Sequence, residues 1–71
     1  MAKQSVRADV WSFYRSGLSE ELVADNPMEA MAAYGQVEAA IEAVAHLMDP
    51  GVSLVLEMRA GSLYIVRKEG S

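Results

Sequence analysis

Residues 51–66 read GVSLVLEMRAGSLYIV, and this stretch decides the fold class. From residue 52 onward the large aliphatic side chains recur at every second position, which is the period of a β-strand. The pair Ala60-Gly61 interrupts this alternation, and the alternation resumes at Leu63. The sequence therefore predicts an antiparallel β-hairpin with its turn at residues 60 and 61.

The register of this hairpin follows from its turn. The expected pairs are Arg59 with Ser62, Met58 with Leu63, Glu57 with Tyr64, Leu56 with Ile65 and Val55 with Val66. In this register the large aliphatic side chains share one face and cover the helices. Ala-Gly is not the favoured Asn-Gly turn, so a register shifted by one residue stays open.

The opposite face of the hairpin carries Val55, Tyr64 and Val66, which is unusually apolar for a surface in water. A two-stranded ribbon also has two free edges, and isolated hairpins are marginal in water. Pairing with a second copy or with a partner's strand would solve both problems. We therefore expect these three residues on a dimer or partner surface.

Two helices are predicted ahead of the hairpin. Residues 5–17 place their apolar side chains on one side at a spacing of 100° per residue, and Ser5 and Gly17 suit the two ends. Residues 19–24 are expected to form one short helical turn, with a loop as the alternative.

The second helix is expected to cover residues 27–48. Asn26 and Pro27 give a capping side chain and a proline at the first helical position. The Asp-Pro-Gly sequence at 49–51 gives the stop. The predicted fold is thus α+β: an N-terminal amphipathic helix, a short turn, a long central helix and a C-terminal hairpin packed on the helices.

Length and composition limit the classes of function. The 71 residues suffice for one small domain, 1–71, in which we expect 1–4 and 69–71 to be flexible ends. With no cysteine, the chain has no disulfide framework and no zinc-thiolate site. No secretory signal is recognisable at the N-terminus and no stretch is apolar enough to span a membrane, so a cytoplasmic setting is expected.

The apolar content of 52% is high for so short a chain. A domain of this size hides only about 60% of the surface of its unfolded chain, so apolar area is left over when one copy folds alone. A homodimer or a protein partner is therefore expected.

Acidic residues are concentrated in the middle of the chain. Residues 19–49 hold seven acids and no lysine or arginine, within a net charge of −4. Such a field repels nucleic-acid phosphates and attracts a basic partner. We expect Glu38, Glu42 and Asp49 on one side of the second helix to bind a basic protein surface, with simple solubilisation as the alternative.

A row of small residues, Ala32, Ala39 and Ala43, lies beside this acidic side. Small side chains let a second helix approach closely, which would make the row part of a dimer or partner surface. The alternative is that alanine is simply the best helix former.

Catalytic residues are scarce in this sequence. Glu42, His46 and Asp49 can converge on one helix face as metal ligands might, but their spacing matches neither the Glu-x-x-His of di-iron helices nor the His-Glu-x-x-His of zincins. We therefore predict no catalytic residues, no metal and no cofactor.

These observations favour a small non-catalytic protein-binding module, an inhibitor or adaptor, with a phage or mobile element as a suggested origin. A self-associating assembly subunit is the second hypothesis, and a metal-dependent or acid-base enzyme is the third. The expected partners are a protein with a basic surface and a second copy of the chain, with no direct binding to nucleic acid or membrane.

Overall fold

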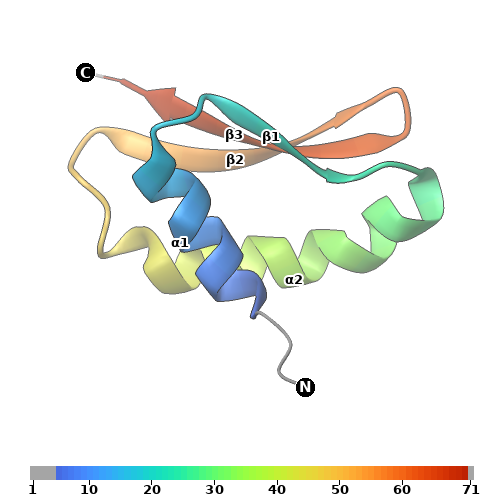
Figure 1. The fold of residues 1–71 in the computed structure, drawn as a ribbon, viewed down its shortest axis with the longest axis horizontal. Helices are drawn as coiled ribbons and strands as arrows, with labels where there is room; N and C mark the ends of the chain where they lie inside the picture. The colour runs from blue at the N-terminus through green and yellow to red at the C-terminus, as the bar shows by residue number, and fades with distance from the viewer. Residues whose placement is uncertain (1–4, 71) are drawn as a thin grey trace.

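The computed structural model describes residues 5–70 of the chain. Five elements follow one another in the order α1, β1, α2, β2, β3 (Figure 1). Their bounds are Val6–Ser16 for α1, Glu20–Ala24 for β1, Pro27–Ala45 for α2, Val52–Arg59 for β2 and Ser62–Glu69 for β3. The predicted α+β class, with helices packed on a C-terminal hairpin, is confirmed.

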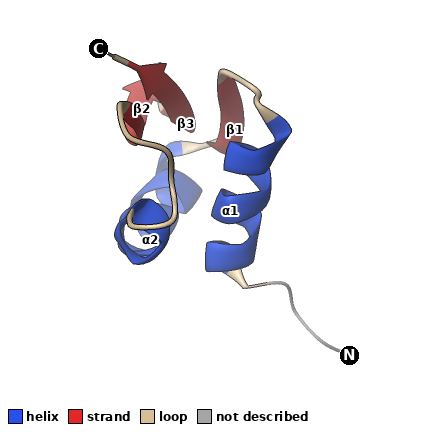
Figure 2. Cartoon of the chain, turned by 90° about the vertical axis from the view of Figure 1, so that its left-hand side faces the viewer, coloured by secondary structure: helices blue, strands red, loops and turns tan. Residues whose placement is uncertain are grey.

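The strands form one antiparallel sheet in the order β1-β3-β2, so β3 is the central strand. Both helices lie against the same face of this sheet, α1 on the side of β1 and α2 on the side of β2 (Figure 2). The molecule therefore has two layers. The outer face of the sheet, which points away from the helices, is covered by no helix within residues 5–70.

The first helix forms where its capping residues predict it. The Ser5 side chain accepts a hydrogen bond from the Ala8 backbone N–H at 3.1 Å, which satisfies one of the free donors of the first turn. Gly17 adopts the left-handed conformation with φ 77°, and its N–H donates to the Tyr14 carbonyl. Both expected ends are confirmed.

Residues 20–24 are neither the helical turn nor the loop expected from the sequence. They form β1, which pairs with β3 so that Glu20 lies opposite Val66, Glu21 opposite Ile65 and Leu22 opposite Tyr64. The hairpin thus gains a third strand from its own chain, and β3 has no free edge. Pairing with a strand about 40 residues away overrides the weak local preference of two glutamates.

The second helix begins as predicted and ends earlier. Asn26 caps it by accepting from the Glu29 N–H at 2.9 Å, but regular helix stops at Ala45 instead of residue 48. Leu47 and Met48 donate to the carbonyls three residues before them, which tightens the last turn. This turn brings the Asp49 backbone N–H to the Tyr14 hydroxyl, 2.8 Å away.

The hairpin has the register that the sequence predicts. All five expected pairs occur, from Arg59 with Ser62 to Val55 with Val66. The helix-facing side of β3 carries Leu63 and Ile65, both fully buried. They join side chains of both helices and β2 in the core, whose largest cluster consists of Val10, Phe13, Tyr14, Val37, Ala40, Val44, Leu54 and Ile65.

Residues 69 and 70, which the sequence predicts to be flexible, have defined backbone hydrogen bonds or strand structure. Glu69 is the last residue of β3, and the Gly70 N–H donates to the Gly51 carbonyl at 2.8 Å. A side chain at Gly51 would place its Cβ 2.7 Å from the Gly70 carbonyl oxygen, so glycine is required there. The other expected flexible residues, 1–4 and 71, lie outside the described range.

The hairpin turn contains a strained residue that a substitution can relieve. Ala60 and Gly61 both have positive φ, 51° and 83°, as a type I′ turn requires. We expect Ala60→Asn to stabilise the protein by about 1 kcal/mol, because asparagine tolerates the left-handed region better than alanine. Thermal unfolding should show a midpoint raised by roughly 4–8 °C.

Gly61→Ala is the matched control. Its Cβ would sit 3.1 Å from the Pro27 side chain at a positive φ, so this variant should be less stable than the wild type. An unchanged or lowered midpoint for Ala60→Asn would contradict the assignment of strain to residue 60.

Candidate functional site

The outer side of α2, which points away from the core, carries the two predicted acids that remain on this helix. Glu38 and Glu42 are exposed, and neither makes a salt bridge with any residue between 5 and 70. Their spacing of four residues places them on one side of the helix, opposite the buried positions Val37 and Val44. The structure therefore brings these two carboxylates together as the sequence predicts.

Two exposed methionines lie on the same outer side of α2. Met28 is 82% exposed and Met31 is 78% exposed. Met31, Gly35, Glu38 and Glu42 follow at spacings of four, three and four residues, so they form one continuous row. A Cβ at Gly35 would meet nothing within 4 Å, which leaves the surface low in the middle of that row.

Asp49 does not belong to this row. It lies beyond the end of α2. Its carboxylate accepts a hydrogen bond from the Tyr14 hydroxyl at 2.9 Å, and its backbone N–H donates a hydrogen bond to the oxygen of that hydroxyl. The pair joins α1 to the loop before β2. Asp49 is thus part of the packing of the fold, although its side chain still reaches the surface.

The predicted alanine row is divided. Ala32 and Ala39 are exposed on the outer side of α2, whereas Ala43 is half-buried. The helix that packs against α2 within the chain is α1, and the alanines in the core between them are Ala33 and Ala40. The helix contact within the chain therefore uses a neighbouring side of α2.

The three predicted residues of the outer sheet face lie together but are half-buried. Val55 is opposite Val66, and Tyr64 is flanked by Glu57 and by Leu22 of β1. Leu22, which the sequence did not predict for this face because β1 was not expected, is 45% exposed. The outer sheet face is thus wider than the hairpin alone.

Charged side chains reduce the exposure of that face. The Arg59 guanidinium lies 4.9 Å from the centroid of the Tyr64 ring and bridges to Glu20 at 2.8 Å and Glu57 at 2.7 Å. The hydrogen bond from Arg59 holds the pKa of Glu57 below its usual value, and Lys68 lowers it further. This network links all three strands and covers the aromatic ring.

A second arginine lies on the helix side of the sheet. Arg67 follows Leu63 and Ile65 in the alternation of β3, and its side chain is only 18% exposed. Its guanidinium lies over the Tyr14 ring at 5.2 Å, and its buried Nε finds no hydrogen-bond partner within residues 5–70. Arg67 therefore packs as part of the fold at the same end of α1 that Asp49 holds.

The alternative of a metal site is not supported by the placement of its residues. His46 follows the last residue of α2 and Asp49 lies beyond it, so Glu42, His46 and Asp49 do not share one helix face. Among residues 5–70, no three acidic or histidine side chains are grouped so that they could hold a metal ion.

Comparison with protein-family models, with curated proteins and with solved structures finds no match. Within the described part of the chain, neither helix combines the length and the apolar character that crossing a bilayer demands. The function must therefore be inferred from the surfaces themselves.

The hydrogen bonds of Tyr14 give a test of the structural role of Asp49. We expect Tyr14→Phe to lower the free energy of unfolding by about 1–3 kcal/mol, because it removes a donor to Asp49 and leaves a backbone N–H without its acceptor. Urea denaturation measures this difference. Tyr34→Phe, on the exposed part of α2, is the control and should unfold at the wild-type urea concentration; equal stability of both variants would refute the role.

Proposed function

We propose that this chain is a small non-catalytic protein-binding module, an inhibitor or adaptor that binds a basic protein surface through the outer side of α2. The observation that carries the proposal is the row formed by Met31, Gly35, Glu38 and Glu42, with Met28 beside it. It combines exposed apolar side chains with carboxylates that no cation in the described part of the chain neutralises.

Each component of this row has a role in such a contact. Methionine is flexible and polarisable, so it adapts to the shape of a partner and is common at binding surfaces. The carboxylates raise the encounter rate with a positively charged surface and orient it. Glu38 and Glu42 act in this way, whereas the predicted Asp49 lies beyond the end of α2 and is bonded to Tyr14.

The proposal includes the setting expected from the sequence. The cysteine-free chain suits the cytoplasm, and its acidic central segment favours a protein partner over direct binding to nucleic acid. A phage or mobile-element origin fits a small acidic inhibitor and rests on size and charge alone.

The proposal predicts that reversing two charges abolishes partner capture. Immobilised wild-type protein should retain a basic partner from the native host, and Glu38→Lys/Glu42→Lys should reduce the amount retained about tenfold or more, because like charges then face each other. Mass spectrometry identifies and quantifies the retained protein.

Asp25→Lys/Glu69→Lys is the control for this experiment, since it changes the net charge equally at two exposed residues outside α2, one in the loop before it and one at the end of β3. Retention of the same partner by the Glu38/Glu42 variant would remove this surface from the proposal.

A second candidate function is self-association through the outer sheet face. The specific observation in its favour is that helices cover one face of the sheet only, while Leu22, Val55, Tyr64 and Val66 gather on the other. Glu20, Glu57, Arg59 and Lys68 surround them with both signs of charge, which a symmetric dimer can match.

This second function predicts a dimer in sedimentation equilibrium that Val66→Glu converts to a monomer, because the new carboxylate would be buried without a partner. Ala39→Glu, on the outer side of α2, is the control and should leave the dimer intact. A wild-type protein that stays monomeric at high concentration would exclude self-association.

A further inference from the structure

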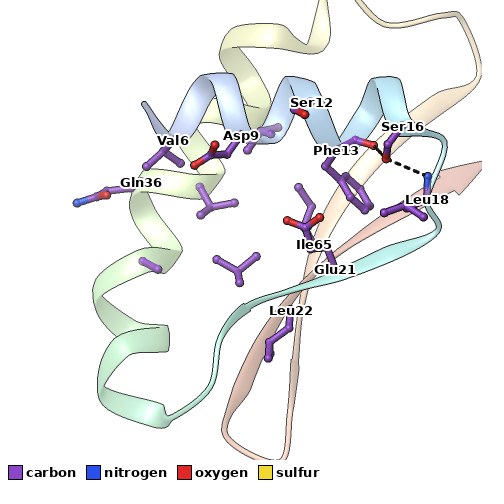
Figure 3. Close-up of a pocket in the computed structure, with 14 residues that line it drawn as sticks. Val6, Asp9, Ser12, Phe13, Ser16, Leu18, Glu21, Leu22, Gln36 and Ile65 are labelled. Atoms are coloured by element: carbon purple, nitrogen blue, oxygen red, sulfur yellow. Dashed lines mark hydrogen bonds between the residues drawn. The ribbon is translucent and has the colours of Figure 1, made fainter. Parts of the chain in front are cut away.

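An open groove lies between α1 and β1, with α2 as its floor (Figure 3). Of the other elements, α1 packs mainly against α2. The volume of the groove is about 550 Å³. Its accessible apolar lining comes from Val6, Leu18, Val23 and Ala33, and the buried core residues Val10, Phe13, Val37 and Ile65 border it.

The groove opens at the free edge of the sheet. β1 pairs only with β3, and the Ser19 carbonyl accepts from the Arg67 N–H at 2.9 Å. Because hydrogen-bonded and non-hydrogen-bonded pairs alternate along antiparallel strands, the backbone N–H and C=O groups of Glu20 and Leu22 point away from β3. Leu22 borders the groove, although its side chain, opposite Tyr64, belongs to the outer sheet face, so the free edge of β1 runs beside the groove.

Two carboxylates of the groove set the charge of its occupant. Asp9 comes from α1 and Glu21 from β1, and neither makes a salt bridge with any residue from 5 to 70 (Figure 3). A second copy adding its own β1 here would bring glutamates close to glutamates, which is unfavourable across paired strands. A segment with lysine or arginine is favoured instead.

We propose that this groove binds an extended peptide segment of a partner protein, which adds as a strand to the free edge of β1. The segment places one aliphatic or aromatic side chain against the exposed Leu18 and the half-buried Val23, and a lysine or arginine beside Asp9 and Glu21. Alternate residues of a strand share a face, so these two side chains stand two residues apart. This site is separate from the outer side of α2 and extends beyond the function proposed above.

Selection of random octapeptides displayed on phage, against the immobilised full chain, tests the proposal. We expect the enriched peptides to share an apolar residue and a lysine or arginine that stand two positions apart. The best peptide, made synthetically, should bind in fluorescence anisotropy, and replacing its basic residue by glutamate should weaken binding about tenfold or more.

Two variants of the protein locate the site. Leu22→Pro removes a backbone N–H that faces away from β3, so it should keep the fold, checked by circular dichroism, and abolish binding; Leu22→Val keeps this donor and should bind normally. Glu21→Lys changes only an exposed side chain and should weaken binding of the basic peptide about tenfold or more.

If Leu22→Pro fails to fold, strand pairing is tested from the peptide side. The best peptide, N-methylated on alternate amides, cannot pair as a strand and should not bind the wild-type protein. Glu38→Lys/Glu42→Lys should bind the peptide like the wild type, which separates this site from the outer side of α2. Absence of enriched peptides, enrichment of acidic ones, or binding unaffected by Glu21→Lys would overturn the proposal.

Discussion

The burial of the central strand is the constraint on which the rest of this structure depends. Leu63 and Ile65 of β3 are fully enclosed, which requires a paired strand on each side of β3 and helices across one face. The hairpin supplies β2, and β1 supplies the other neighbour. The core is formed by one face of the sheet together with α1 and α2. The outer sheet face and the outer side of α2 therefore remain for contacts with other molecules.

The sequence predicts those parts of the fold that short-range rules control. The capping residues Ser5 and Asn26 locate the starts of the two helices. The alternation after Gly51 gives the hairpin register. β1 was missed because its five residues are too few to show a period and begin with two glutamates; its stability comes from pairing with β3, which is distant in sequence. The early end of α2 was missed as well: the last turn tightens and places Asp49 on Tyr14, a tertiary contact that no local pattern contains.

The candidate surfaces also differ in how far short-range patterns predict them. Helical periodicity is enough to place Glu38 and Glu42 together on the outer side of α2, whereas Asp49 leaves that side because the helix ends before it. The groove between α1 and β1 results from how far two elements stand apart, so no residue pattern predicts it. Both surfaces carry carboxylates, which suit basic partners at either position; Glu21, Glu38 and Glu42 come from the acidic middle of the chain, and Asp9 comes from α1.

The backbone contact between Gly70 and Gly51 fixes where any fused tag leaves the molecule. It holds the end of β3 beside the loop that joins α2 to β2, at one end of the sheet (Figure 1). The start of α2 lies at the opposite end, where Pro27 approaches the hairpin turn at Gly61. A fluorophore or affinity handle attached after Gly70 is therefore positioned far from Met28, which favours C-terminal over internal attachment in immobilisation and labelling work.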